Sequence, residues 1–342
     1  MVTTSAALSA RPELRAASRP RPDPVNNRLL VVQGGDVQHR RVADLPALLG
    51  EGDLLVLNDA ATLPASLPGE GLEWRLASRV GPDLWWAVVF GPGDWRLDTD
   101  TRPAPGPIPR RPVVAGVAVE VLARSPLSPR LLLIRAPEGF DAAVFRAGRP
   151  VQYSYMDGDL PLERVQTAIA GPPWAVEAPS AAFALRWRLL DQLRAAGVAI
   201  ATVTHAAGLS ATGDPALDRR LPLPERSRVP AATWRAARAA RRVIAGGTSA
   251  ARALESAAAD PVGVAALDSG QDWEHMARLV LGPSRPLRLV SGLLSNIHGP
   301  GESHFRLMCA FAPEPVLLRA HEAAREQGYL NHEFGDGTLL LP

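Results

Sequence analysis

The chain changes its hydrophobic pattern twice, and these two changes limit the folds that are open to it. Residues 68–149 consist of short apolar or alternating runs separated by turns that are rich in proline and glycine. The runs cover residues 73–80, 84–90, 113–123 and 131–135. Several short strands at this spacing predict a small β-barrel or sandwich. On both sides of this segment, helical and strand patterns alternate instead.

The flanking segments predict an α/β domain. Strands are expected at residues 28–33, 54–57, 198–203 and 243–245, and helices at 43–49, after an N-cap at Ser180 and after an N-cap at Thr233. The helix after Ser180 would pack through Phe183, Trp187, Leu190 and Leu193. This alternation predicts helices on both faces of a sheet. Because 342 residues are enough for two cores, we predict an α/β main domain from residues 1–67 and 150–342, with an inserted small β-barrel domain at residues 68–149.

All 37 basic residues are arginines, and the absence of lysine excludes several kinds of enzyme site. Schiff-base chemistry, the P-loop and the kinase nucleotide site each need a lysine amine. Cys309 is the only cysteine, so intrachain disulfides and cysteine-rich zinc sites are excluded as well. Because no run of 18 apolar residues is present, we expect no membrane partner and a cytoplasmic location.

The segment after the strand at 243–245 is the strongest binding motif that the residues themselves suggest. Gly246 and Gly247 allow a tight turn, and Thr248 and Ser249 begin a helix whose free N–H groups can bind an anion. Arg252 lies about one turn into that helix. The alternative is a turn whose glycines serve only the packing of the helix against the strand.

Two further polar pairs follow apolar strands. Asn58 and Asp59 stand at the carboxyl end of the strand at 54–57, where open α/β sheets bind ligands, although an Asx turn is the structural alternative. Asn296 and His298 follow another apolar run, and they could recognise a base or ribose or could cap the loop. His298 could also transfer a proton near neutral pH.

Two sets of ring-bearing side chains have less specific meanings. His298 and His304 could bind a metal, but no HExxH motif or nearby pairing of carboxylate and histidine supports this, so we predict no metal. Tyr153 and Tyr155 could stack on nucleic acid bases, as could the tryptophan pair at residues 85–86. Core packing is the alternative for at least one tryptophan of that pair.

Four segments and a closing one, taken in order, match one set of family motifs. Residues 54–67 resemble a strand leading into N-D-T-R-V-I-P-A-R-L, and residues 166–179 resemble Y-Q-T and A-P-T-A-G-L-H-F. Residues 247–256 resemble G-T-T-S-x-R-x-L-E-S, and residues 296–311 resemble T-N-F-H-x-P through S-A-F. Residues 329–336 resemble the closing Y-R-F-F-S-Y-G-D. The set covers nearly the whole chain and resembles the S-adenosylmethionine:tRNA ribosyltransferase-isomerases of queuosine biosynthesis.

This resemblance implies an α/β domain with an inserted β-barrel, and S-adenosylmethionine as co-substrate without a metal. In such enzymes the aminomethyl group of a 7-deazaguanine base in tRNA attacks the ribosyl group of S-adenosylmethionine. Rearrangement then yields epoxyqueuosine and releases adenine and methionine. Carried onto this chain, the resemblance implies that S-adenosylmethionine is bound by Gly247, Thr248, Ser249, Arg252 and Asn58. It places Asp59, Asn296 and His298 in the reaction or base pocket, with His298 as the candidate for proton transfer.

Several polar positions of the family pattern are substituted. Residues 60–61 are alanines where the family has Thr-Arg, Ala184 replaces a histidine, and the histidine expected at Ala206 is displaced to His205. On a strand, such a displacement points the side chain to the opposite face. Of H-x-M-H-x-E only Glu225 is kept. These changes leave two alternatives open: use of S-adenosylmethionine with a non-tRNA acceptor or as a lyase, and a non-catalytic nucleoside- or RNA-binding protein.

Overall fold

The larger part of the molecule is built on a nine-stranded mixed sheet. The computed structural model describes residues 14–342. The strands, in their order across the sheet, are β17 (Trp273–Ala277), β15 (Glu225–Val229), β14 (Ala199–His205), β4 (Asp53–Asn58), β16 (Arg242–Gly246), β18 (Gly292–Asn296), β20 (Gly337–Leu341), β2 (Arg28–Gln33) and β3 (Asp36–Arg41). The four strands β14, β4, β16 and β18 are parallel, whereas β17, β15 and β20 run antiparallel to their neighbours toward the centre. This parallel centre confirms the predicted α/β class.

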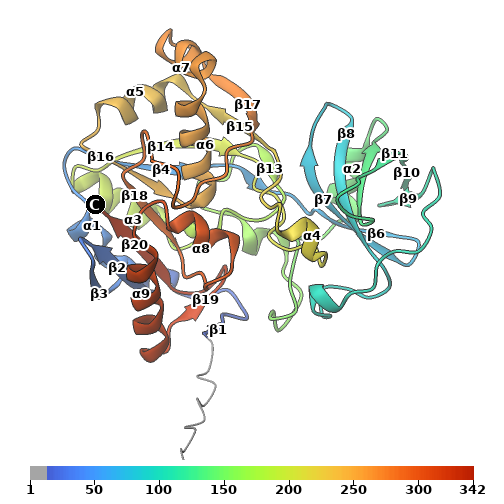
Figure 1. Ribbon diagram of the computed structural model, residues 1–342, viewed down its shortest axis with the longest axis horizontal. Helices are drawn as coiled ribbons and strands as arrows, with labels where there is room; N and C mark the ends of the chain where they lie inside the picture. Colours follow the sequence, from blue (N-terminus) through green and yellow to red (C-terminus); the bar gives the residue numbers. More distant parts are fainter. Residues whose placement is uncertain (1–13) are drawn as a thin grey trace, which may run out of the picture.

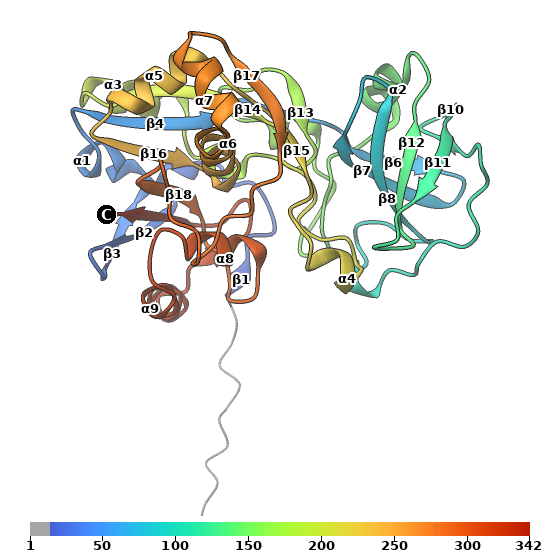
Figure 2. The ribbon, with the colours of Figure 1, turned by 45° about the horizontal axis from the view of Figure 1, so that its top comes forward.

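Helices cover both faces of this sheet (Figures 1 and 2). One face carries α1 (Leu45–Leu48) and α3 (Trp187–Ala195), and the other carries α5 (Ala231–Ala239), α6 (Thr248–Ala259), α7 (Pro261–Asp268), α8 (Ser303–Met308) and α9 (Glu314–Glu326). Successive residues of β4 point to opposite faces, so Leu54 and Val56 join the core under α6 while Leu55 and Leu57 join the core under α3. A strand buried on both faces explains why this segment is continuously apolar.

Residues 66–147 form a second body that Figure 1 shows at one end of the molecule. Its antiparallel sheet contains, in spatial order, β11 (Glu120–Arg124), β12 (Leu131–Arg135), β8 (Leu84–Phe90), β7 (Leu72–Arg79) and β6 (Ser66–Gly69). The hairpin β9 (Val113–Val114) and β10 (Val117–Ala118) and the helix α2 (Phe140–Ala147) complete it. Trp74, Phe90 and Phe140 are buried in a core that also takes in Val176, Leu209 and Leu217 from the rest of the chain. The two outer strands β11 and β6 do not pair with each other in the described part of the chain, so closure into a barrel is not confirmed.

The two segments that connect the β-rich body to the rest of the chain lie side by side. The backbone N–H of Ser66 donates to the carbonyl of Arg149 at 2.9 Å, and the N–H of Arg149 donates back to the carbonyl of Ser66 at 2.9 Å. These reciprocal hydrogen bonds tie the two connections together at the base of the β-rich body. The strands and the helix of this body lie at residues 66–147, and the predicted division at residues 68–149 into separate domains stays a prediction.

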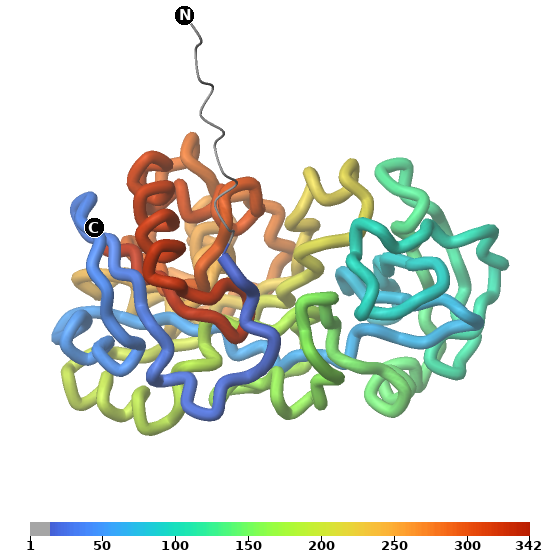
Figure 3. Tube along the Cα trace, turned by 90° about the horizontal axis from the view of Figure 1, so that it is seen from below, coloured from blue at the N-terminus to red at the C-terminus, as the bar shows by residue number. Residues whose placement is uncertain are grey.

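Smaller elements join distant parts of the sequence. β1 (Arg15–Ala16) pairs with β19 (Leu330–Asn331), so the first described residues lie beside the C-terminal region, as Figure 3 shows. β5 (Ala61–Thr62) pairs with β13 (Pro173–Ala175), and α4 (Pro215–Asp218) lies between the two bodies in Figure 2. None of the helices formed by residues 14–342 is long and apolar enough to cross a membrane.

Several predicted elements differ from the observed ones. The run at 113–123 is three short strands, because Ala115 and Gly116 adopt positive φ angles of 53° and 82° and turn the chain. Ser180 does not cap the predicted helix: residues 180–182 form a single 3-10 turn, and α3 begins only at Trp187. Leu190 and Leu193 are buried as predicted, but Trp187 is 55% exposed, and Leu189 completes the buried face of α3.

The predicted N-cap of α5 is also wrong. This helix begins at Ala231, after Pro230, and Thr233 already lies within its first turn. The hydroxyl of Thr233 donates to the carbonyl of Thr202 at 2.7 Å and so links α5 to β14. A residue suited to capping can thus serve the packing of a helix on the sheet when a proline already sets the helix start.

Candidate active site

A cavity of about 920 Å³ lies at the carboxyl ends of β16 and β18. Its walls come from the β16–α6 turn, from the loop between β18 and α8, and from segments around residues 177–181, 207–211 and 332–333. Six of the predicted site residues line it on two walls: Gly247, Thr248, Ser249, Arg252, Asn296 and His298. Open α/β sheets bind their ligands at this edge, so the cavity is the candidate active site.

The N-terminus of α6 forms one wall of the cavity. Gly247 has a φ of 105°, a conformation that favours glycine, and its N–H donates to the carbonyl of Leu294 at 2.7 Å. The first backbone bond within the helix runs from Ala251 to Gly247, and no side chain caps the helix among the described residues. The N–H groups of Thr248 and Ser249 are therefore available to an anionic ligand group.

The neighbouring Gly246 serves the packing of the strand, which was the alternative function of these glycines. A Cβ on Gly246 would stand 2.3 Å from Cδ2 of Leu57, a distance that real Cβ atoms do not show. Gly246 thus allows β16 to pack closely beside the Leu57 side chain, while Gly247 forms the turn. The two glycines have different functions, one in packing and one in shaping the cavity wall.

Asn58 does not line the cavity, which corrects its predicted contact with S-adenosylmethionine. It is fully buried, and its amide group donates to the carbonyl of His205 at 2.9 Å and to Oγ of Ser249 at 3.2 Å. Its Oδ1 accepts from the N–H groups of His205 and Ala60, and the second of these bonds is the Asx turn that was the structural alternative. The four bonds use the whole hydrogen-bonding capacity of an amide side chain. Asn58 therefore positions Ser249.

Asp59 also lies outside the cavity, which corrects its predicted catalytic contact. Its Oδ1 accepts a hydrogen bond from the hydroxyl of Thr204 at 2.7 Å, and its backbone N–H donates to the carbonyl of Val203. These bonds hold the end of β4 against β14. Successive residues of an extended segment point in opposite directions, so Asp59 faces away from the partners of Asn58.

Arg252, predicted to bind S-adenosylmethionine, lines the cavity, but its guanidinium is bound by the protein. It donates to the carboxylate of Glu225 and to three carbonyl oxygens, those of Leu279, Leu223 and Ala277. His205 shares the same carboxylate, with 2.7 Å between Nε2 and Oε2 of Glu225. Arg252 is 2% exposed and anchors the helix to its neighbours.

The electrostatics of Glu225 follow from this buried cluster. Burial alone would raise the pKa of its carboxyl group, but the charge of Arg252 and the hydrogen bond with His205 outweigh burial and lower it. Glu225 therefore stays ionised at neutral pH and lines the cavity as an anion.

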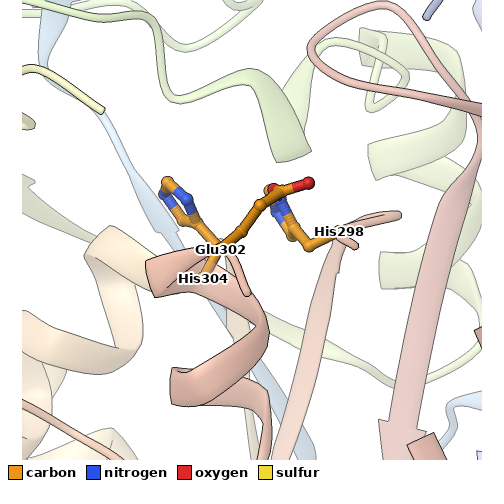
Figure 4. Close-up of side chains that lie close together, drawn as sticks. All are labelled: His298, Glu302 and His304. Atoms are coloured by element: carbon orange, nitrogen blue, oxygen red, sulfur yellow. The ribbon is translucent and has the colours of Figure 1, made fainter. Parts of the chain in front are cut away.

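His298 is held in the cavity by a carboxylate (Figure 4). Its Nδ1 lies 3.1 Å from Oε2 of Glu302, and the other oxygen of Glu302 accepts from the N–H of Gly299 at 2.8 Å. Burial would raise the pKa of Glu302, but these bonds and the nearby imidazole lower it to about 2. An ionised carboxylate fixes the orientation of the imidazole, an arrangement that is suited to proton transfer at Nε2.

Asn296 links two walls of the cavity. It lies at the end of β18, and its amide group donates to Oγ of Ser180 at 2.9 Å and to the carbonyl of Glu333 at 3.4 Å. Ser180, predicted as a helix cap, is thus a cavity residue. No pattern in the sequence connected Ser180 with Asn296.

The residues His298, Glu302 and His304 could together hold a metal ion, because their ligand atoms lie within 4.8 Å of one another. The sequence argument against a metal overlooked Glu302, which stands between the two histidines. The rings of His298 and His304 are stacked, with centroids 4.5 Å apart and planes 12° apart. Two imidazoles that share one ion must direct their nitrogens at it, so metal binding would require one ring to rotate.

Sequence analysis also missed a wall of the cavity formed by Glu177, Glu333 and His332 with Tyr153 and Tyr155. Only the tyrosine pair had been singled out, as possible stacking residues. The two glutamates come from segments far apart in the sequence, so no local pattern joins them. The only indication in the sequence was that both glutamates lie close to segments that match the family motifs, at residues 178–179 and 335–336.

Comparisons with known proteins agree with the order of motifs along the chain. The family model described as queuosine biosynthesis protein matches residues 10–340. The chain belongs to this queuosine biosynthesis protein family. Relatives in the family include the S-adenosylmethionine:tRNA ribosyltransferase-isomerases of Gloeobacter violaceus, with 35% identity over 97% of this chain and 94% of the relative, and of Thermus thermophilus, with 32% identity over 89% of both.

A solved structure supports the fold of this family member. The crystal structure of an S-adenosylmethionine tRNA ribosyltransferase from Thermotoga maritima matches with a TM-score of 0.52 and 22% identity, over 97% of this chain and 99% of that chain. At this identity the likeness concerns the fold alone.

Proposed function

We propose that this chain transfers the ribosyl group of S-adenosylmethionine to a 7-aminomethyl-7-deazaguanine base in tRNA and rearranges it to give epoxyqueuosine, releasing adenine and methionine. The observation that carries the proposal is membership of a family whose relatives bear that enzyme's name, over nearly the whole chain. The substituted polar positions do not remove the cavity, because its walls are formed by other residues.

The size and polarity of the cavity agree with two reactants. Its volume of about 920 Å³ is large for a small-molecule site, which leaves room for S-adenosylmethionine together with a base turned out of the RNA. We assign the methionine carboxylate to the free N–H groups of Thr248 and Ser249, because a helix N-terminus favours a negative group. Asn58 and Arg252 are positioning residues for this wall.

The proton transfers are assigned to the pair of His298 and Glu302. The sulfonium of S-adenosylmethionine acidifies the adjacent C–H and makes sulfur a leaving group, so the protein must move protons and align the reactants. A carboxylate at Nδ1 keeps Nε2 of His298 free to accept a proton. Asn296, on the same wall, uses both amide hydrogens within the protein, so its Oδ1 is left to accept from the ribose or the base. This scheme requires no metal.

We also infer that residues 68–149 act as a separate inserted domain. Most of the core around its sheet comes from the segment itself, and the two connections to the rest meet at Ser66 and Arg149. Asp100, from this segment, lines the cavity, so the domain contributes to the site.

The proposal is tested by measuring adenine and methionine released from S-adenosylmethionine, with and without tRNA that carries the 7-aminomethyl base. Release that requires the tRNA, with a matching gain in the mass of the RNA, is the expected result. Release without tRNA would assign the protein to a different acceptor or to lyase chemistry. Binding of S-adenosylmethionine without release in either sample would favour a non-catalytic protein and overturn the proposal.

A further inference from the structure

One wall of the cavity is an aromatic stack flanked by two carboxylates, here called the tyrosine–glutamate wall. It consists of Tyr153, Tyr155, His332, Glu177 and Glu333, all of which line the cavity. The ring centroids of the two tyrosines are 5.9 Å apart with planes 18° apart, and the rings of the second tyrosine and the histidine are 4.3 Å apart with planes 15° apart. The three rings are thus nearly parallel and stacked on one another, with Tyr155 in the middle and the guanidinium of Arg75 over Tyr153. A planar ligand can therefore extend the stack at His332, which lines the cavity.

Each carboxylate is fixed by a tyrosine hydroxyl. Both oxygens of Glu333 lie 2.6 Å from the hydroxyl of Tyr155, which donates to them. Glu177 accepts from the hydroxyl of Tyr153 and from the backbone N–H of Ser210, the latter at 2.9 Å. These bonds hold both side chains in one orientation at the aromatic surface.

Neither carboxylate forms an ion pair with a basic side chain within residues 14–342. Burial raises the pKa of Glu177 to about 7, and the charge of Glu333 contributes to the same shift. Buried acidic groups in proteins are normally paired with a cation. A raised pKa means that Glu177 holds a proton near neutral pH, and a cationic ligand group between the two carboxylates would favour its ionised form. The neighbouring aromatic rings favour a ligand of the same positive charge.

The other polar wall of the cavity has the opposite character. The N-terminus of α6 presents N–H groups and the positive end of a helix dipole. A cavity with one anion-binding wall and one cation-binding wall holds two ligands in positions that their charges determine. Under the proposed function, the methionine carboxylate belongs at α6, and the acceptor base carries a primary amine that is protonated in water.

We propose that the tyrosine–glutamate wall is the subsite for the acceptor base, in which the aromatic stack takes the face of the ring while Glu177 and Glu333 bind the ammonium of its aminomethyl side chain. This inference rests on the proposed function and adds to it the residues that select the amine. The carboxylates also place the amine inside the cavity that holds His298. Enzymes that act on a base in RNA read it by stacking and by polar contacts after turning it out of the helix.

The test compares two RNA stem-loops, one carrying the 7-aminomethyl base and one carrying the same base with an uncharged nitrile. We expect the unaltered protein to bind the amine-bearing RNA about tenfold or more tighter, because a charged hydrogen bond is gained. Glu333→Gln and Glu177→Gln keep the shape of the side chains but remove the charge, and each should reduce this preference to about threefold or less. Glu138→Gln, at an exposed glutamate far from the cavity in sequence, is the matched control and should keep the full preference.

The outcomes separate this inference from the proposed function. Full preference for the amine in both glutamine variants would overturn the subsite, even if the unaltered protein forms product. A rise in the KM for S-adenosylmethionine with unchanged RNA preference would assign the wall to the sulfonium or amino group of that ligand and would also overturn it. Loss of preference in the variants, with no product from the unaltered protein, would support the subsite and refute the proposed reaction. Thermal unfolding of each variant shows whether it is folded, and Tyr155→Phe provides a further variant that keeps the ring.

Discussion

Replacing Glu177 by glutamine should stabilise the protein at alkaline pH and leave its stability unchanged in acid. Burial raises the pKa of Glu177 from 4.5 to about 7, so the folded protein retains a proton that the unfolded chain has lost. The native state is therefore penalised increasingly as pH rises from about 4.5 to 7, and the penalty is complete above pH 7. At 1.36 kcal/mol per pH unit, the full penalty is about 3 kcal/mol.

Partial access of solvent to Glu177 reduces that figure, so we expect Glu177→Gln to gain about 1–3 kcal/mol at pH 8 relative to its effect at pH 4. Glutamine keeps an oxygen that can accept from Tyr153 and Ser210, so the hydrogen bonds do not account for the change.

The assay is urea unfolding of the variant and the unaltered protein at several pH values, with Glu138→Gln as an exposed control. Only the difference between the two proteins is used, because other titrating groups contribute equally to both. A stability difference that is the same at pH 4 and pH 8 would refute the argument, since it would show that Glu177 is ionised as easily in the folded protein as in the unfolded chain.

Further substitutions test the positions of site residues. Asn58→Ala should lower the free energy of unfolding by about 2–4 kcal/mol, because it leaves buried backbone groups without partners, and an effect below 0.5 kcal/mol in urea unfolding would contradict its positioning role. Arg252→Ala should cost about 3–5 kcal/mol by leaving Glu225 as an unpaired buried charge, and Arg252→Ala combined with Glu225→Gln should recover part of that loss. His298→Gln should lower kcat for adenine release by about 10²–10⁴-fold without changing the free energy of unfolding. Glu302→Gln should lower kcat less. Equal activity of the two variants and the unaltered protein would exclude proton transfer at this pair.

Much of the fold could be predicted because single segments determine it. The strand at 28–33 was predicted with the bounds that β2 has, and the apolar run at 54–57 lies within β4. The turn at Gly247 was correctly predicted to precede a helix, because the positive φ of this glycine and the regular helix after it depend on neighbouring residues. The predicted strand at 113–123 failed because a two-residue turn was hidden within an apolar run.

The site was harder to predict because its members come from distant segments. The sequence placed Asn58 at the correct end of its strand, but the direction of its side chain depends on β14 and α6, which lie far along the chain. Arg252 was assigned to a ligand because its partner Glu225 belongs to another strand of the sheet. The pairing of Glu177 and Glu333 at one wall likewise depends on tertiary structure. A motif indicates which residues approach a site, whereas hydrogen-bond partners decide which of them remain free to contact a ligand.

The reciprocal hydrogen bonds between Ser66 and Arg149 have a consequence for how this chain tolerates rearrangement. Since the two connections to the β-rich body are already adjacent, a short glycine linker could join them directly, and closing so short a gap costs little conformational entropy. The large sheet then keeps every one of its nine strands, because none comes from the excised segment. A shortened chain lacking residues 68–147 would, however, uncover Val176, Leu209 and Leu217, which lie outside this segment but are buried in the same core. An exchange of the β-rich body between family members therefore has to supply a surface that covers the same three side chains.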